Sequence, residues 1–174
     1  IEGLAEVLKR NIKAQHQNVV CVTGGTGSGK SHFAIKLAMA IDPHFSFAND
    51  YIYSAKDLAV KLGRPPSNVS PVSLFDEGSV VLNSMNFQRK GDKNITTLFD
   101  TMRSRGWTTI ICIPKLRSLN NRVRDDHLNF IVGCGLKPPI RGYQRRGFVQ
   151  LLMKQEQGMF SEGTYFKPMC WGVY

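Results

Sequence analysis

The most constraining feature of the sequence is a glycine-rich run between a short apolar segment and a helical pattern. The apolar segment, NVVCVT at residues 18–23, is rich in β-branched residues and predicts a buried strand. The segment after the glycines, KSHFAIKLAMAI, has helical spacing up to Asp42, and Pro43 stops the helix. This order places converging backbone N–H groups at a helix N-terminus, where the helix dipole is positive. Such an arrangement predicts a site for phosphate groups.

The run itself matches the pattern GxxxxGK[ST], which is typical of a phosphate-binding loop. Its residues are Gly24, Gly25, Thr26, Gly27, Ser28, Gly29, Lys30 and Ser31. We expect Lys30 to reach the β- and γ-phosphates of ATP and the Ser31 hydroxyl to bind Mg²⁺. His32 follows on the helix and is included among the nucleotide-contacting residues without an assigned chemistry. The alternative, an ordinary glycine-rich turn, is disfavoured by the strand and the helix on either side.

Two adjacent acidic residues follow a second apolar run, VSLF. Asp76 and Glu77 come at the end of this predicted strand, where both side chains can reach a cleft at the sheet edge. One carboxylate is needed beside Mg²⁺, which fits Asp76, and hydrolysis needs a group that activates water, which fits Glu77. A turn with two solvated acids is the alternative. Beside the glycine-rich loop, the pair predicts hydrolysis of ATP rather than phosphate transfer to a metabolite.

Strand and helix patterns alternate along the chain, which predicts an α/β fold with a mainly parallel sheet flanked by helices. Helical spacing covers residues 4–13 and 94–105, and a capping-box pattern at Ser54 and Asp57 starts a helix that reaches about Leu62. Further strands are expected at TTIICI and around residues 128–133, and the YIY pattern at residues 51–53 predicts a short strand. The segment KPPIRG is expected to break the chain, and FVQLLMKQ and TYFKPMCWGVY to form a hairpin-like extension. The 174 residues suit one domain, with a core at about 15–135 and a β-rich extension at 138–174.

The charge of the chain is strongly positive and uneven. The formal net charge is +10, and residues 101–150 hold ten Lys or Arg residues against two Asp residues. This asymmetry indicates an anionic partner, most plausibly nucleic acid, with a solvated basic face as the alternative. No apolar run is long enough to cross a bilayer, no signal peptide is visible at the start, and the four cysteines are interpreted as buried thiols in a reducing compartment. We therefore expect a cytoplasmic protein.

Arginines precede the strand TTIICI. We expect Arg103 to lie at the carboxyl edge of the sheet, where open α/β folds bind ligands. From there it can reach a γ-phosphate across a subunit boundary, or it can cap the negative end of its helix. Arg105 is the second candidate for the same role.

The combination of GGTGSGKS, SLFDEG, a helix ending in MRSRG, the strand TTIICI and the segment RSLNNRVR resembles the FtsK–HerA superfamily of P-loop ATPases. The resemblance covers residues 15–135 and is greatest to the small viral and plasmid branch, which includes genome-packaging ATPases and zonula-occludens-toxin-like ATPases. It implies a RecA-like P-loop fold and an arginine finger that acts on the neighbouring subunit, a role that falls on Arg103. A second arginine after the strand would correspond to Arg124 or Arg122. Members usually form hexameric rings that thread double-stranded DNA.

One position departs from the family pattern. The strand that TTIICI resembles usually ends in a glutamine that senses the γ-phosphate, and here the residue is Pro114, which has no polar side chain. The sequence thus predicts a Mg²⁺-dependent ATPase that moves or packages DNA, encoded by a virus or mobile element. A replication or helicase-loader ATPase, a small-molecule kinase, and a module in which nucleotide only orders an assembly are the alternatives.

Overall fold

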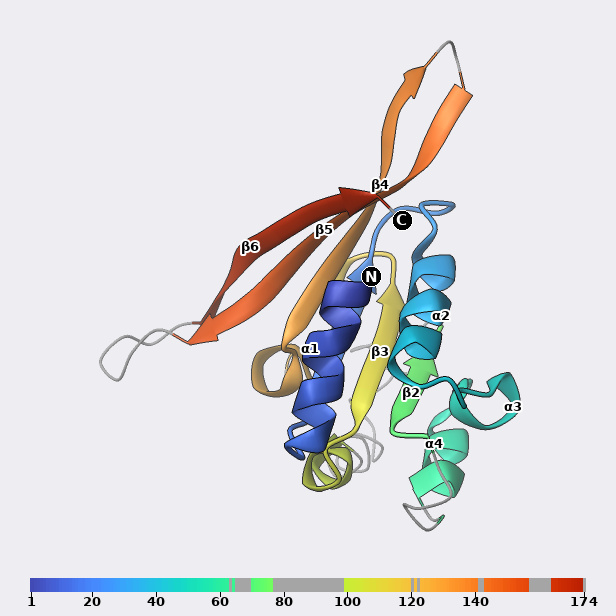
Figure 1. Cartoon of the computed structure of the whole chain (residues 1–174), viewed down its shortest axis with the longest axis vertical. Coiled ribbons are helices and arrows are strands. Elements are labelled where there is room, and N and C mark those ends of the chain that lie inside the picture. The colour runs from blue at the N-terminus through green and yellow to red at the C-terminus, as the bar shows by residue number, and fades with distance from the viewer. Residues whose placement is uncertain are drawn as a thin grey trace.

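The computed structural model describes residues 1–62, 64, 70–76, 99–119, 121, 123–140, 143–156 and 164–173. Within these residues the strands form one six-stranded sheet with the order β2-β3-β1-β4-β5-β6 (Figure 1). The strands are β1 (Asn18–Thr23), β2 (Val72–Phe75), β3 (Thr108–Ile113), β4 (Phe130–Ile140), β5 (Tyr143–Glu156) and β6 (Thr164–Val173). The first four in spatial order are parallel, and β5 and β6 are antiparallel additions. The prediction of an α/β fold with a mainly parallel sheet is confirmed.

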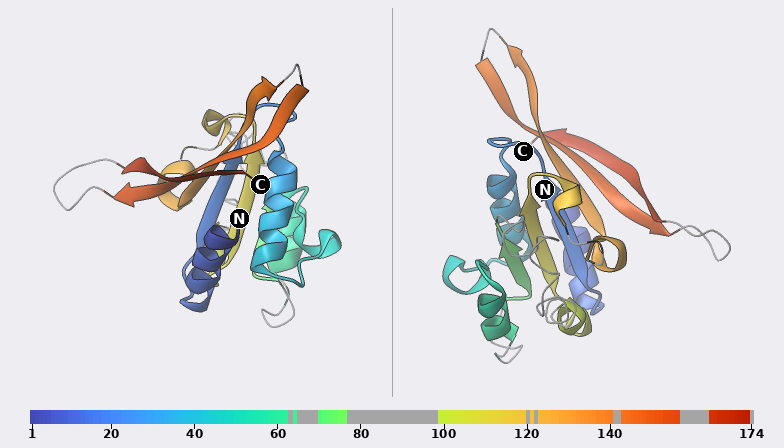
Figure 2. Two further views of the ribbon diagram at one scale, coloured as in Figure 1. Left: turned by 45° about the horizontal axis from the view of Figure 1, so that its top comes forward. Right: turned by 180° about the vertical axis from the view of Figure 1, so that it is seen from behind.

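Helices cover both faces of the sheet, and the two longest lie on the same face (Figure 1). These are α1 (Glu2–Lys13) and α2 (Lys30–Ile41). The short helix α3 (Phe47–Asp50) follows α2. The opposite face, seen from behind in Figure 2, carries α4 (Ala55–Leu62), a helix at 99–104, a 3-10 turn at Leu116–Ser118 and a π-type turn at Val123–His127. The helical predictions at 4–13 and after Lys30 are confirmed, and the part of the 94–105 prediction that is described is helical.

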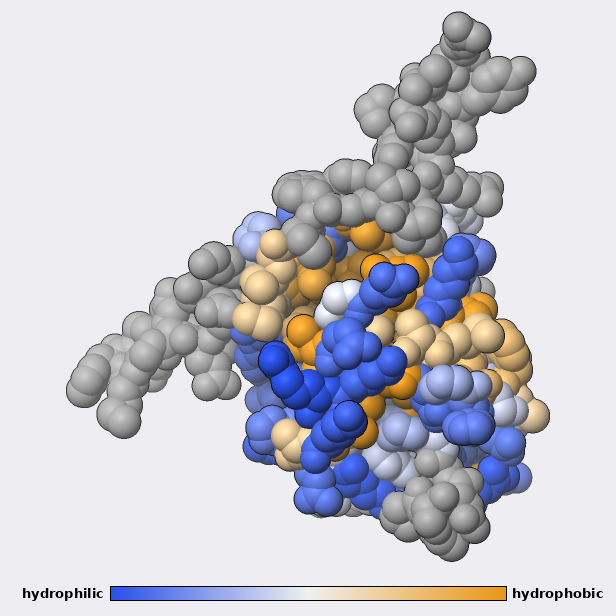
Figure 3. Space-filling model, in the orientation of Figure 1, coloured by the Kyte–Doolittle hydropathy of each residue, from blue (hydrophilic) through white to orange (hydrophobic). Residues whose placement is uncertain are grey.

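The core is divided into two layers because successive strand residues point to opposite faces of the sheet. In β1, Val20 and Val22 pack under α1 and α2, whereas Val19 and Cys21 pack against the other layer. On the α1 and α2 face, apolar residues are visible between the polar outer surfaces of these helices (Figure 3). The sequences of the inner strands are therefore nearly continuous apolar runs, as expected for strands that are covered on both sides.

Local capping patterns in the sequence are realised in the structure. The backbone N–H of Asp57 donates to Ser54 Oγ at 3.2 Å, and Ser54 Oγ donates to an Asp57 carboxylate oxygen at 2.9 Å, so the capping box at the start of α4 is confirmed. The helix at 99–104 ends at Gly106, whose φ of +64° puts it in the left-handed region. The possible strand at 51–53 is reduced to one bridge, between Tyr51 and Leu74 of β2.

The expectation that KPPIRG breaks the chain is wrong, because β4 continues through Ile140 and stays paired with the antiparallel strand β5, which begins at Tyr143. Pro138 and Pro139 are accommodated where the register between the two strands shifts, between Gly135 and Ile140. They can lack backbone N–H groups there because β1 stops pairing with β4 at Gly133. Beyond that point the described residues 136–140 of β4 and 143–147 of β5 form a two-stranded ribbon, which we call the arm (Figure 1).

Three of the cysteines, Cys21, Cys112 and Cys134, are buried, as predicted. The side chain of Cys170 lies outside the described part of the chain. Among the described residues, no helix has the length and apolarity needed to cross a membrane. The boundary between a nucleotide-binding core and an extension near residue 135 stays a prediction.

Candidate nucleotide-binding site

The glycine-rich loop lies at the carboxyl edge of the sheet, between the end of β1 and the start of α2 (Figure 1). Gly29 caps α2 with φ of +91°, a left-handed conformation that favours glycine. The first regular helical bond follows at once, since the Phe33 N–H donates to the Gly29 carbonyl at 2.9 Å. The loop therefore sits over the positive end of a twelve-residue helix, which is the geometry that binds phosphate.

Gly24 is required by close packing rather than by the turn alone. A Cβ atom at this position would collide with the carbonyl oxygen of Cys134 on β4 and approach Ser28 Oγ within 2.7 Å. The φ of Gly24 is +152°, which side chains rarely adopt. The start of the loop is thus held against β4 by direct backbone contact.

Lys30 lies over the loop that it is expected to serve. Its Nζ donates to the carbonyl oxygen of Gly25 at 2.8 Å. The Lys30 side chain therefore extends from the N-terminus of α2 back across the loop. From this position it is within reach of a phosphate group seated in the loop, as the motif predicts.

Asp76 faces the loop, as the two-acid pattern predicts. It follows the last residue of β2, and the Ser31 hydroxyl donates to Asp76 Oδ1 at 2.9 Å. The hydroxyl and the carboxylate come from sequence segments that only the parallel sheet brings together. Hard oxygen ligands of this kind suit Mg²⁺, so the residues present fit the metal that the motif implies.

Tyr51 belongs to the same cluster and was missed by sequence reasoning. Its hydroxyl donates to Asp76 Oδ2 at 2.7 Å, so the two carboxylate oxygens of Asp76 have different partners. The pKa of Tyr51 is raised, first by burial and then by the hydrogen bond to Asp76, and the phenol stays a donor at neutral pH. The only signal in the sequence was the YIY pattern, which predicted a strand but gave no role to the hydroxyl.

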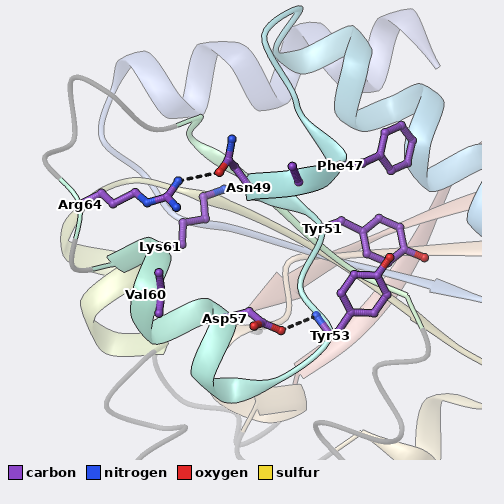
Figure 4. Close-up of a pocket in the computed structure, with 9 residues that line it drawn as sticks. Phe47, Asn49, Tyr51, Tyr53, Asp57, Val60, Lys61 and Arg64 are labelled. Atoms are coloured by element: carbon purple, nitrogen blue, oxygen red, sulfur yellow. Dashed lines mark hydrogen bonds between the residues drawn. The ribbon is translucent and has the colours of Figure 1, made fainter.

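A row of aromatic rings leads from this cluster into a groove between α3 and α4 (Figure 4). The Tyr51 and Tyr53 ring centroids are 4.7 Å apart, and those of Phe47 and Tyr51 are 5.9 Å apart. The groove has a volume of about 430 Å³ and also contains Asp57 and Arg64. Tyr51 therefore links the candidate metal ligand to an open, aromatic-lined surface.

Position 114 lies beside the loop, where a nucleotide-sensing residue would be useful. Thr23, the last residue of β1, donates its hydroxyl to the Pro114 carbonyl oxygen at 3.3 Å. The backbone of Pro114 is thus in place, but the residue offers only its carbonyl group. Pro114 therefore offers no polar side chain to the site, whereas the Tyr51 hydroxyl contacts Asp76.

The expected position of Arg103 is wrong. Arg103 is in the last turn of the helix at 99–104, and this helix leads into the start of β3, at the amino edge of the sheet and opposite the glycine-rich loop. The six residues of β3 alone span about 20 Å, which is longer than an arginine side chain. Arg103 is exposed and lines a pocket of about 650 Å³ with Asp100, His127 and Lys154. It cannot reach the loop of its own chain, so two roles remain: action on a neighbouring subunit and capping of the negative end of its own helix.

The other arginine candidates have partners within the chain or lie outside the described residues. Arg105 is stacked over the Trp107 ring, with its guanidinium carbon 5.2 Å from the ring centroid. Arg124 is paired with Asp125 at 3.0 Å. Arg122 and Glu77 lie outside the described part of the chain, so their predicted roles stay predictions. His32 is exposed on the first turn of α2.

Comparison with solved structures defines the class of fold. Neither a protein-family model nor a curated protein sequence matches the chain. The fold is that of the RecA-like P-loop NTPases, with the glycine-rich loop in the position that this fold gives to the phosphate loop.

The similar structures include the genome packaging NTPase B204 from Sulfolobus turreted icosahedral virus 2 in complex with AMPPCP. Its TM-score is 0.52 at 13% identity, and the match covers 88% of this chain and 98% of that chain. The same protein in complex with ATP-gammaS matches with a TM-score of 0.50. The N-terminal domain of zonular occludens toxin from Neisseria meningitidis matches at 0.49 and 15% identity, over 89% of this chain and 94% of that chain. Replication initiator DnaA matches at 0.47 and 17% identity, and the match spans 45% of its length.

Proposed function

We propose that this protein is a Mg²⁺-dependent ATPase that couples hydrolysis to the movement or packaging of double-stranded DNA, and that it works as a homo-oligomer. The observation that carries the proposal is the 2.9 Å contact between Ser31 and Asp76 at the mouth of the glycine-rich loop. An ordinary glycine turn does not need a carboxylate from a separate strand at this point. The proposal therefore rests on the contact between the phosphate loop and a carboxylate that is suited to bind the metal.

Each residue of the candidate site has a separate role in the proposed hydrolysis. The loop amides and Lys30 bind the triphosphate, and they favour the charge that develops on it during hydrolysis. Ser31 and Asp76 would hold Mg²⁺, which would neutralise negative charge on the triphosphate. Glu77, next to Asp76 in the sequence, orients the attacking water and accepts its proton. Arg103 contributes to the site of a neighbouring copy.

Two observations support DNA as the partner. The formal charge of +10 is concentrated between residues 101 and 150, which suits a polyanion. The fold is shared with a viral genome packaging NTPase, a protein described in complex with ATP analogues. A nucleotide-ordered assembly module is the second candidate, and Pro114 favours it because it provides no polar side chain for sensing nucleotide state.

ATP turnover by purified protein, with and without double-stranded DNA, tests the proposal. We expect magnesium-dependent turnover that DNA stimulates. Lys30→Ala should abolish most turnover, and Glu77→Gln should keep Mg-ATP binding while losing turnover. Binding without turnover in the unmodified chain would leave the assembly module as the function.

A further inference from the structure

We propose that the groove between α3 and α4 binds single-stranded nucleic acid by stacking unpaired bases on its aromatic rings. This is the groove of about 430 Å³ that Tyr51 links to the carboxylate of Asp76. The inference goes beyond the proposed function, which concerns double-stranded DNA and assigns no role to this groove. Sequence reasoning expected only a short strand and a helix in the region and gave it no ligand.

The rings of the groove are held in a row by one another. Phe45 is buried, and its ring meets the Phe47 ring at 73° with the centroids 5.7 Å apart. Phe47 is in turn tilted by 33° against Tyr51, and Tyr51 by 38° against Tyr53. Because neighbouring rings already restrict these side chains, a flat ligand that stacks on the row immobilises few additional rotamers.

The outer rings of the row are open to solvent. Phe47 is 53% exposed, Tyr53 is 70% exposed, and Val60 of α4, which also lines the groove, is 52% exposed. Large apolar side chains that are exposed together indicate a binding surface. Aromatic side chains stack on any base, because every base has a π face. A base inside a duplex is already covered on both faces by its neighbours, so unpaired bases are the ligand that suits the row.

The far end of the groove carries positive charge. Figure 4 shows Arg64 on the side opposite the rings of Phe47 and Tyr53. Arg64 Nη1 donates to Asn49 Oδ1 at 2.8 Å, and this neutral amide orients the guanidinium without cancelling its charge. Arg105 Nη1 approaches the Arg64 carbonyl oxygen, at 3.5 Å. Within the part of the chain that the structure describes, neither arginine forms an ion pair, so both can attract the phosphates of a bound strand.

The acidic side chains beside the groove are already engaged. Asp50 pairs with Lys61 at 2.9 Å, and both side chains are buried. Asp57 accepts hydrogen bonds from the Ser54 hydroxyl and from the backbone N–H of Tyr53, at the start of α4. The cations at the far end are therefore left for an anionic ligand, in a chain whose formal net charge is +10.

A peptide suits the groove less well than a nucleic-acid strand does. A peptide that adds a β-strand needs free backbone groups. The N–H of Ile52 already donates to the Leu74 carbonyl at 2.8 Å, and the N–H of Tyr53 donates to Asp57. A proline-rich peptide docks on aromatic rings, but its backbone offers no anion to Arg64. A single strand offers both flat π faces and phosphates.

The first part of the test removes the rings. The ring variant carries Phe47→Ala and Tyr53→Ala. Its matched control carries Met39→Ala and Met169→Ala, which truncate two apolar side chains outside the groove that are each 52% exposed. The second part removes the cation with Arg64→Gln, and its control is Arg10→Gln, which replaces an exposed arginine of α1.

Affinity is measured by fluorescence anisotropy across a salt series. The probe is a fluorescein-labelled pyrimidine DNA strand of about 12 nucleotides, within the site sizes of single-strand-binding folds. The RNA strand of matching sequence and the duplex with the complementary DNA strand are measured in parallel. Binding of a fluorescent ATP analogue and the thermal midpoint, both without nucleic acid, report whether each variant is folded.

The two kinds of variant should differ in their dependence on salt. We expect the ring variant to lose at least about fivefold in single-strand affinity for each ring, for whichever of DNA and RNA the parent binds. Its slope of affinity against salt concentration, both on logarithmic scales, should stay unchanged because a ring neutralises no phosphate. Arg64→Gln should make this slope shallower by about 0.7 for each phosphate that is no longer neutralised. Both controls should stay near the parent.

Three results would overturn the inference. These are single-strand affinity that is unchanged in the ring variant, an equal loss in its control, and a loss that is as large for the duplex as for the single strand. A salt slope that Arg64→Gln leaves unchanged would also contradict it and would favour a peptide. If the double variant is unfolded, Phe47→Leu and Tyr53→Leu, which keep apolar volume without a flat ring, decide by the same criteria.

The outcomes separate this inference from the proposed function. Ring-dependent binding of single strands by a chain that hydrolyses no ATP leaves the groove and removes the motor. Turnover that duplex DNA stimulates, together with single-strand binding that does not depend on the rings, leaves the motor and removes the groove.

Discussion

At the scale of single residues, the carboxylate of Asp76 is the point where three segments meet. Ser31 of α2 donates to one oxygen and Tyr51 donates to the other. A carboxylate bound on both oxygens cannot rotate freely about its terminal bond. Tyr51 is therefore a positioning residue, which keeps one oxygen of Asp76 directed at Ser31.

The substitution Tyr51→Phe removes only this hydroxyl. A hydrogen bond to a charged group contributes about 1.5–3 kcal/mol, so its loss should let the carboxylate turn away from Ser31. We expect the magnesium concentration that gives half-maximal ATP turnover to rise several-fold. The KM for ATP at saturating magnesium should change little.

Tyr53→Phe is the matched control, since Tyr53 stacks on Tyr51 but is 70% exposed. The magnesium dependence of this variant should follow that of the parent. Identical magnesium curves for the two variants would contradict the role given to Tyr51.

The residues of the phosphate loop and Asp76 could be predicted from sequence because they follow one another along the chain in a fixed order. Tyr51 could not, since its contact with Asp76 depends on how the segment after α3 lies against β2. The edge of the sheet on which Arg103 lies was predicted wrongly for a similar reason. An arginine before a strand lies at the amino edge, and only residues that follow a strand reach the carboxyl edge.

At the scale of elements, a buried ion pair ties α4 to α3 and β2. Lys61 Nζ lies 2.9 Å from Asp50 Oδ1, and the two side chains are 1% and 3% exposed. Lys61 also donates to the Val72 carbonyl, and its ammonium lies 5.3 Å from the centroid of the Trp107 ring. Burial lowers the pKa of Lys61, and the neighbouring Asp50 opposes that shift.

The substitution Lys61→Met should reduce the free energy of unfolding by about 3–5 kcal/mol, because it leaves the Asp50 carboxylate buried without its cation. Pairing it with Asp50→Asn removes the stranded charge and should recover part of the loss. Urea unfolding of the parent, the single variants and the double variant measures this coupling. Additive effects in the double variant would show that the two charges do not act as a pair.

The elements that sequence patterns predicted well are those in which local and tertiary preferences agree. The helix α4 begins at its capping box, and β1 and β3 contain the apolar runs VVCV and IICI because both faces of these strands are covered. The arm was missed because two prolines normally end a strand. They are compatible with β4 because β1 stops pairing with it at Gly133, and the place where β1 ends is set by the sheet and not by the local sequence of β4.

At the scale of the whole molecule, stability should depend on pH through His127. This side chain is 5% exposed, and burial is the main cause of a pKa below the ordinary value of 6.5, with Asp100 at 3.8 Å acting in the opposite direction. The unfolded chain therefore takes up a proton at a higher pH than the folded chain. The contribution to stability is full above about pH 6.5 and is lost as the pH falls toward the folded pKa.

The substitution His127→Gln removes this source of proton uptake. Urea unfolding between about pH 7.5 and 5.5 should show a smaller loss of stability in the variant than in the parent. A parallel decline in the two proteins would exclude His127 as the cause. His44→Gln serves as the comparison, because His44 is exposed.

Assembly can be tested with mixed subunits. Arg103→Ala and Glu77→Gln should each lack turnover alone, since one removes the proposed finger and the other the proposed base. In a mixture, a subunit that keeps Glu77 can sit beside one that keeps Arg103, so part of the activity should return. Absence of activity at every mixing ratio would contradict action between subunits.

The placement of Arg103 and the glycine-rich loop at opposite edges of the sheet has a consequence for symmetry. If the arginine of one copy meets the loop of the next, the two surfaces that touch are different, and the interface is heterologous. Two-fold pairing, in which one patch meets its own equivalent, cannot satisfy such an arrangement. Copies joined in this way either close on themselves through rotation or continue as an open helical filament.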